Sequence, residues 1–310
     1  MSSGKNIKDK MNITVLTGFL GSGKTTLLQR LIIEAKEAGK KVAIVMNEFG
    51  SFDVDSQLLG EGISSKSLLN GCICCSLKDD MEVVLHNLYH SEKPDLVIIE
   101  ATGIAHPVEI VDACQNPTIV DKVHMPFIIG VMDGKRYIER DRYSNQTKHL
   151  MEEQMANAHV IVVNKSDELS NEEKGMLEDH LNEIKHQPDV YFTNYSKIDQ
   201  IIERDDAIIN IEGKHSHHHH GIQSINYTFD GPIKMELLIR FLQQLPDSIL
   251  RIKGFVKFQE EPDQTYLFQH AFGVPQYEPE MMNMPLTIVI IGETIDKAYL
   301  RNKLDMLNFT

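Results

Sequence analysis

Short, unbroken apolar runs alternate with segments of helical periodicity in the first part of the chain. The apolar runs cover residues 13–17, 41–46, 96–99, 126–132 and 159–163. Between them, apolar side chains recur at helical spacing over 25–38, 79–90 and 145–158. Strands that lack in-out alternation and are separated by helices are typical of a parallel sheet with helices on both faces. The pattern therefore predicts an α/β domain with a mostly parallel sheet flanked by helices.

The pattern changes near residue 200. Residues 203–221 are charged and then rich in histidine, so we predict a linker there. Beyond it, alternating segments typical of strands cover 222–229, 249–259, 264–271 and 286–291, and helical patterns cover 233–245 and 294–307. We expect a disordered N-terminus over 1–11, one domain over 12–202 and a smaller C-terminal α+β domain over 222–310.

Composition agrees with two globular domains and excludes some functions. A chain of 310 residues suggests two domains of about 150 residues each. Its 42% hydrophobic and 25% charged residues exclude a wholly disordered, collagen-like or coiled-coil chain. The 31 basic and 45 acidic residues give a net charge of −14. Nucleic acids and anionic membranes present many negative charges, and a protein that binds them needs a basic surface. We therefore expect neither a nucleic acid nor a membrane as partner.

The start of the chain has one feature of a secretory signal. Lysines at 5, 8 and 10 precede an apolar run over 13–21. The run is short, has no cleavage-like small-residue site and leads directly into Gly23-Lys24-Thr25. No stretch approaches the ~20 apolar residues of a membrane-spanning helix. We therefore interpret the run as a buried strand and expect a cytoplasmic protein.

The segment GFLGSGKT at 18–25 fits the phosphate-binding pattern G-x-x-x-x-G-K-[ST]. It follows a predicted strand and opens a predicted helix, which is the context that the pattern requires. Backbone N–H groups of the loop and of the helix N-terminus favour bound phosphates. Lys24 would reach the β- and γ-phosphates, and the Thr25 hydroxyl would ligate Mg²⁺. The predicted nucleotide contacts in this loop are Gly21, Ser22, Gly23, Lys24, Thr25 and Thr26.

A second motif, Asn164-Lys165-Ser166-Asp167, closes the apolar run 159–163. The Asp167 carboxylate can accept both hydrogens that guanine offers at N1 and at its exocyclic amine. Adenine offers neither in that geometry, and a carboxylate left unpaired in a buried site is costly. Asn164 and the stem of Lys165 would hold the loop and cover the base. Together with the phosphate loop, this motif favours guanine over adenine.

A third motif, DLVIIEATG at 95–103, is an apolar strand that ends in an acid and then a glycine. Glu100 would hold Mg²⁺ through a water molecule. The Gly103 N–H would bond the γ-phosphate and so sense hydrolysis. Many GTPases carry Asp at this acidic position, whereas this chain carries Glu100. With these roles, Lys24, Thr25 and Glu100 are the predicted catalytic residues.

Three of the four cysteines stand together in Gly71-Cys72-Ile73-Cys74-Cys75. Thiols so close in sequence are poor disulfide partners for one another and are candidates for metal or redox chemistry. Thiolates prefer Zn²⁺, Cu(I) and similar ions over Mg²⁺. Cys72 and Cys74 would share a face if the segment is extended, and Cys75 would then point elsewhere. Another ligand must come from outside the motif, and Glu48 is one candidate. A redox pair and simple packing are the alternatives.

A histidine run occupies residues 215–220, with Ser216 interrupting it. Imidazole binds Zn²⁺, Ni²⁺, Co²⁺ and Cu²⁺, and a flexible run binds them weakly and at several sites. We favour metal capture or buffering here, while an expression tag and a neutral linker are the alternatives. The residues concerned are His215, His217, His218, His219 and His220.

These motifs together resemble one family. GFLGSGKTTLL at 18–28, NEFG at 47–50, GCICC at 71–75, EATG at 100–103 and NKSD at 164–167 resemble the CobW-type metallochaperone GTPases. These proteins are relatives of the hydrogenase and urease nickel-insertion GTPases. The resemblance covers nearly the whole chain, because 222–310 looks like the family's C-terminal domain. It implies a P-loop NTPase fold, slow GTP hydrolysis, transition-metal binding at the cysteine motif and GTP-gated transfer of the metal to a client protein.

The chain departs from the family pattern at two positions. Ser51 follows NEFG where the family often has another acidic residue, so a ligand role near Glu48 is less secure. His106 stands where an acidic or amide residue is common. It is a possible extra ligand, although we favour a histidine that is exposed or satisfied by a protein partner.

We expect a GTPase whose nucleotide state sets its metal affinity, with GTP, Mg²⁺ and Zn²⁺ bound; cobalt or nickel would satisfy the same ligands. Hydrolysis should be slow, because no residue in the sequence stands out to position the attacking water. A passive metal store and an ATP-dependent phosphotransferase are the alternatives, and Asp167 argues against the second. The C-terminal domain has a strand face that can dock a client and an edge that can mediate self-association. The sequence decides neither.

Overall fold

A computed structural model describes residues 10–46, 72–74, 78–185, 187–198, 221–271 and 274–309, without the side chains of 72–74 and 78–80. By its internal contacts the chain divides into two units. The first comprises residues 1–114 and 122–218, and the second comprises 115–121 and 219–310. Within the described residues, every helix is too short or too polar to span a lipid bilayer.

The first unit contains a parallel sheet with the strand order β3-β2-β4-β1-β5-β6-β7. Its strands are β1 (Asn12–Thr17), β2 (Val42–Met46), β3 (Cys72–Cys74), β4 (Leu96–Glu100), β5 (Phe127–Asp133), β6 (Val160–Asn164) and β7 (Asp189–Phe192). Every residue of β6 is buried, and so are the first four of β4. Because consecutive side chains point to opposite faces, such strands need cover on both faces of the sheet.

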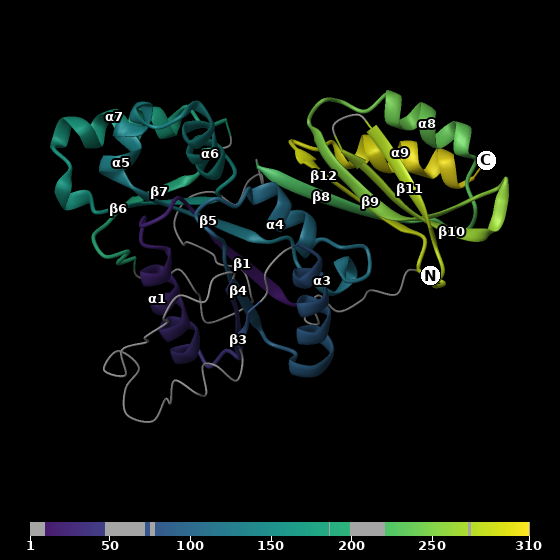
Figure 1. Cartoon of the computed structure of the whole chain (residues 1–310), viewed down its shortest axis with the longest axis horizontal. Coiled ribbons are helices and arrows are strands. Elements are labelled where there is room, and N and C mark those ends of the chain that lie inside the picture. The colour runs from purple at the N-terminus through teal and green to yellow at the C-terminus, as the bar shows by residue number, and fades with distance from the viewer. Residues whose placement is uncertain are drawn as a thin grey trace. The chain divides into compact units, whose positions relative to one another are not determined.

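Helices supply that cover. They are α1 (Lys24–Glu37), α3 (Lys78–Asn87), α4 (Pro107–Cys114), α5 (Gly134–Ile138), α6 (Asn145–Ala156) and α7 (Asn171–Asn182). Short helical turns lie at η2 (Leu88–Glu92), η3 (Val120–Lys122), η4 (Glu139–Arg142) and η5 (Ser166–Glu168). Figure 1 shows α1 on one side of β1 and β4, and α3 and α4 on the other. The predicted α/β fold is confirmed.

The apolar stripe of α1 fixes where the phosphate loop lies. Its leucines at 27, 28 and 31 are fully buried and pack on Leu16 of β1, Ile98 of β4 and Val131 of β5. Burial of side chains of this size stabilises the fold by about 1.5–3 kcal/mol each. The start of α1 is therefore held at the carboxyl end of β1, beside the ends of β4 and β5.

The second unit is an antiparallel sheet with the strand order β11-β10-β9-β12-β8 and two helices. Its elements are β8 (Ile222–Thr228), α8 (Met235–Gln243), β9 (Ile249–Phe258), β10 (Glu261–Ala271), β11 (Val274–Glu280), β12 (Thr287–Glu293) and α9 (Lys297–Asn308). Both helices lie on one face of the sheet (Figure 1), where Phe241 and Leu304 join a core with Ile252 and Ile290. The predicted α+β arrangement is confirmed.

The segment 115–121 lies between α4 and β5 in the sequence but belongs to the second unit. The Ser224 hydroxyl of β8 donates a hydrogen bond to Gln115 Oε1 at 2.8 Å. Asn226 of the same strand donates to Asp121 Oδ1, also at 2.8 Å. Residues 115–121 are thus part of the second unit, although the chain before and after them belongs to the first.

Candidate functional site

The loop between β1 and α1 has the backbone geometry that its glycines predict. Gly18 and Gly23 have φ angles of +138° and +106°, which side chains rarely allow. A Cβ atom on Gly18 would lie 2.0 Å from the Val131 carbonyl oxygen, and one on Gly23 would lie 2.2 Å from Asn164 Nδ2. Gly23 precedes α1 and carries no side chain that caps it. The first N–H groups of α1 and its positive end therefore remain suited to an anion.

Two polar side chains follow at the start of α1. Lys24 is nearly buried, and its Nζ donates hydrogen bonds to the carbonyl oxygens of Gly18 at 2.7 Å and Phe19 at 3.2 Å. The hydroxyl of Thr25 donates to Glu100 Oε1 at 2.7 Å. Since Glu100 ends β4, the loop and the acidic strand meet at the carboxyl edge of the sheet. A hydroxyl and a carboxylate at this spacing are ligands that Mg²⁺ accepts.

Gly103 lies directly against the phosphate loop. A Cβ atom on it would lie 2.6–2.7 Å from three atoms of Leu20, including the backbone nitrogen. The turn after β4 therefore approaches the loop more closely than any residue with a side chain allows. The structure thus brings Thr25 of the phosphate loop together with Glu100 and Gly103 of the motif 95–103.

The loop 164–167 is joined to the phosphate loop by Asn164, which is buried. Its Nδ2 donates a hydrogen bond to the Ser22 carbonyl at 2.8 Å, and its Oδ1 accepts one from the Ser196 N–H at 2.9 Å. Lys165 adopts a left-handed conformation with φ of +56°, and its Nζ donates to Asp133 Oδ2 at 2.6 Å. Asp167 is exposed to solvent, and its backbone N–H donates to Asn194 Oδ1 at 2.9 Å.

The turn 193–197 is a part of this site that the sequence motifs did not indicate. Asn194 accepts hydrogen bonds from the Ser166 hydroxyl and the Asp167 N–H, and the Ser196 hydroxyl donates to the Gly23 carbonyl at 3.2 Å. Tyr195 and Ser196 both have positive φ angles, 54° and 51°, which for residues with a side chain is uncommon. The only signal for this turn in the sequence is its place directly after a strand. It holds the loop 164–167 against the phosphate loop.

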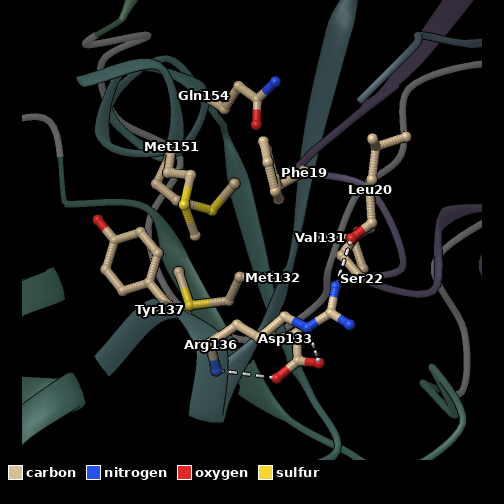
Figure 2. Close-up of a pocket in the computed structure, with 11 residues that line it drawn as sticks. Phe19, Leu20, Ser22, Val131, Met132, Asp133, Arg136, Tyr137, Met151 and Gln154 are labelled. Carbon is tan, nitrogen blue, oxygen red and sulfur yellow. Dashed lines mark hydrogen bonds and ion pairs between the residues drawn. The ribbon is translucent and has the colours of Figure 1, made fainter. Parts of the chain in front are cut away.

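A pocket lies between the phosphate loop, β5, α5 and α6 (Figure 2). Its wall includes Phe19, Met132, Met151 and the neutral hydroxyphenyl ring of Tyr137, whose pKa burial raises to about 12. Beside it, Arg136 donates to the Leu20 carbonyl at 3.0 Å and pairs with Asp133 at 3.7 Å. Asp133 and Arg136, which the sequence analysis did not single out, thus connect the loop 164–167 to the phosphate loop.

The predicted metal residues are described only in part. Cys72 and Cys74 lie in β3, whose register places Cys72 opposite Ile44 and Cys74 opposite Met46. Cys75, Glu48 and the histidines at 215 and 217–220 lie outside the described residues. Among the residues that the structure describes, no three His, Cys, Asp or Glu side chains are close enough to hold a metal ion. His106 is half-exposed, and its Nδ1 lies 3.0 Å from Glu153 Oε2.

The role of Asn164 as a connector gives a stability prediction. Replacing Asn164 by alanine is expected to lower the free energy of unfolding by about 2 kcal/mol, because it leaves the Ser22 carbonyl and the Ser196 N–H buried without partners. Urea unfolding followed by circular dichroism measures the change. Asn171→Ala, at an exposed position on α7, is the matched control and should change stability by less than about 0.5 kcal/mol. Equal effects of the two substitutions would contradict the connector role.

Comparison with known proteins assigns both units. Residues 12–192 match the family described as "CobW/HypB/UreG, nucleotide-binding domain", and residues 222–308 match the "Cobalamin synthesis protein cobW C-terminal domain". The zinc chaperone CobW of Pseudomonas aeruginosa is 26% identical over 345 aligned positions, which cover 95% of this chain and 91% of that protein. The zinc chaperone YjiA of Escherichia coli is 30% identical over 278 positions, covering 83% and 85%.

A further relative is matched over a smaller share of its length. The zinc chaperone YeiR of Escherichia coli is 31% identical over 210 positions, which cover 66% of this chain and 63% of that protein. Among solved structures, the Zn(II)-bound YjiA GTPase from E. coli is 26% identical, with a TM-score of 0.49 and coverage of 96% of this chain and 99% of that one.

Proposed function

Since the chain belongs to the CobW/HypB/UreG family, we propose that it is a GTP-hydrolysing metallochaperone. It binds a divalent transition metal, zinc in the first place, at its cysteine motif. It passes the metal to a client protein under the control of bound GTP. The family and the names of three zinc-chaperone relatives support this proposal.

The geometry of the phosphate loop and the loop 164–167 supports guanine nucleotide binding. Asn164 connects the two loops directly through the Ser22 carbonyl. The two loops are therefore close enough to bind one nucleotide, with the base at the loop 164–167 and the phosphates at the phosphate loop. Asp167 is exposed beside this connection and offers two acceptor oxygens. Guanine presents two adjacent N–H donors that pair with one carboxylate, whereas adenine does not. We therefore assign GTP as the nucleotide.

The residues present fit a magnesium ion. The Thr25 hydroxyl and the Glu100 carboxylate already lie 2.7 Å apart at the head of α1. Mg²⁺ in phosphate sites uses one or two protein oxygens together with phosphate oxygens and water. When bound, the ion neutralises charge on the phosphates. Thr25 and Glu100 would hold it, and Lys24 would contact the phosphates.

One observation carries the link between nucleotide and metal: the register of the three strands at one edge of the sheet. Cys74 of β3 lies opposite Met46 of β2, and Met46 lies opposite Glu100 of β4. The strands are neighbours at about 4.8 Å each, so the backbones of Cys74 and Glu100 are about 10 Å apart. Strand β3 therefore ends at the same level of the sheet as Glu100, the proposed magnesium-holding acid. Only β2 lies between β4 and β3, so a conformational change in the turn after β4 would have to be transmitted across one strand to reach the cysteines.

Zinc is the proposed metal because Cys72 and Cys74 supply thiolates two residues apart, with Cys75 next to them, and because the relatives are zinc chaperones. Cobalt and nickel accept the same ligands. The histidine run at 215–220 is proposed to capture metal weakly before transfer. Turnover of GTP is proposed to be slow until a client, a partner arginine or the metal completes the catalytic site.

Zinc affinity measured against nucleotide state tests the proposal. A chromophoric chelator competes for Zn²⁺ with the protein in the presence of GDP, a non-hydrolysable GTP analogue or no nucleotide. We expect the analogue to tighten one zinc site by about tenfold, which corresponds to about 1.4 kcal/mol of coupling. By linkage, zinc must then raise the affinity for the analogue by the same factor.

Two variants separate the proposal from a passive metal store. Cys72→Ser/Cys74→Ser should abolish the nucleotide-sensitive site, whereas deletion of residues 215–220 should leave that site unchanged. If zinc binding ignores the nucleotide and disappears with the histidine run, the chain is a metal buffer on a GTPase fold, and gated transfer is wrong.

A further inference from the structure

Helix α6 places a buried amide directly behind the turn that follows β4. Gln154 is fully buried. Its Nε2 donates hydrogen bonds to the carbonyl oxygens of Gly103 and Ala105, both at 3.2 Å. One side chain therefore spans the turn and fixes two of its peptide groups. Glu153, the preceding residue of α6, approaches His106 of the same turn at 3.0 Å.

The same turn is fixed from the opposite side by the phosphate loop. Gly103 contacts Leu20 so closely that no side chain fits between them. Arg136 donates a hydrogen bond to the Leu20 carbonyl and so anchors that part of the loop to α5. Gly103 is therefore in contact with Leu20 of the phosphate loop and with Gln154 of α6. A change in either neighbour must alter the position of the Gly103 peptide groups.

The chemistry of position 154 is unusual for a packing residue. Its Oε1 has no protein partner among the described residues. In Figure 2 this oxygen points into the pocket between Met151 and Phe19. A buried acceptor with no protein partner is unfavourable for stability, and an apolar side chain of the same length would pack there without that cost. The two hydrogen bonds that the Gln154 side-chain nitrogen donates are therefore the better explanation for a glutamine at this position.

We propose that Gln154 is a positioning residue for the γ-phosphate-sensing turn. It holds the carbonyls of Gly103 and Ala105 so that the N–H of Gly103 faces the γ-phosphate of GTP. This inference rests on the proposed function, because it concerns the response of the same nucleotide site. It assigns to α6, which carries none of the sequence motifs, the discrimination between GTP and GDP.

The substitution Gln154→Met tests the inference. Methionine is unbranched and of similar length, and it joins a pocket wall that already contains Met151 and Met155, so the fold should be retained. Gln146→Met is the matched control, since Gln146 is exposed in the first turn of the same helix. Fluorescent GDP and a fluorescent non-hydrolysable GTP analogue report affinities, steady-state assays report kcat and KM for GTP, and thermal unfolding reports Tm.

For Gln154→Met we expect GDP affinity within about twofold of wild type, and a loss of about tenfold or more in both kcat and the preference for the triphosphate analogue. The Tm should fall by only a few degrees, because the carbonyls of Gly103 and Ala105 lose a donor while the apolar packing is kept. Gln154→Glu removes the same two hydrogen bonds, but it should also lower the Tm, because a carboxylate buried beside two carbonyl oxygens is unfavourable. Gln146→Met should match wild type throughout.

Two results would overturn the inference. One is a Gln154→Met variant that keeps kcat and triphosphate preference within about twofold of wild type. The other is a variant that loses GDP affinity and Tm together with activity, because Gln154 is then a general support of the fold. A wild-type chain with neither turnover nor GTP preference instead overturns the proposed function itself, so the two failures are distinguishable.

Discussion

Replacing Lys24 by alanine is expected to lower GTP turnover by about 100-fold or more, the effect typical of removing one preorganised charge or donor from a transition state. The side chain is nearly buried at the head of α1, and its ammonium lies within hydrogen-bonding distance of two carbonyls of the phosphate loop. From that position it would neutralise the charge that develops on the β- and γ-phosphates. Phosphate release under saturating GTP measures the effect.

Lys36→Ala is the matched control for this substitution. Lys36 lies in the last turn of the same helix, far along it from the phosphate loop, so its removal should leave turnover within about twofold of wild type. Circular dichroism checks that both variants are folded. Normal turnover by a folded Lys24→Ala variant would mean that the loop is retained for structure alone, as a passive metal store requires.

The second large effect is expected from Asp167→Asn, which should weaken GTP binding by about 100-fold and create binding to xanthosine triphosphate. The Asp167 carboxylate accepts two hydrogen bonds from guanine, whereas an asparagine amide presents a donor to one of those donors. Xanthine replaces the exocyclic amine of guanine by a carbonyl, which accepts from that amide. A donor that faces another donor in a ligand site, with the hydrogen bond between them lost, corresponds to about 2–3 kcal/mol.

Competition against a fluorescent guanine nucleotide measures this exchange. Glu168→Gln, at the next exposed position, makes the same change from carboxylate to amide and should leave the preference for GTP over xanthosine triphosphate unaltered. If Asp167→Asn binds GTP within about threefold of wild type, another residue reads the base. If the wild-type chain binds ATP as well as GTP, the assignment of guanine is wrong.

The strands of the parallel sheet were predictable because their apolar runs are unbroken. The sequence intervals for β1, β2, β4, β5 and β6 agree with the structure to within a residue or two. By contrast, α7 reads NEEKGMLEDHLN, in which only Leu177 and Leu181 are buried, so its apolar stripe is too narrow to predict a helix. Strand β11 reads VPQYEPE and is almost wholly exposed. Its pairing with β10, and not its own pattern, makes it a strand.

The candidate site was predictable where a motif acts through a side chain of characteristic chemistry. Lys24, Glu100 and Asp167 are of this kind. Asn194 and Gln154 act by hydrogen bonds to backbone groups that are distant in the sequence. Glutamine in a helix and asparagine in a turn are common, and nothing in a single sequence tells that these two meet a nucleotide-binding loop. Only the packing of α6 and of the turn 193–197 reveals them.

The segment 115–121 bears on how this protein is divided by engineering or by evolution. Its partners Ser224 and Asn226 belong to β8, so a chain cut after the linker would retain the segment and lose the strand that it joins. A transplanted C-terminal domain would likewise lack a piece of its own unit. The two units are each compact by their internal contacts, but they are interleaved in sequence. A functional swap between relatives must therefore exchange 115–121 together with 219–310.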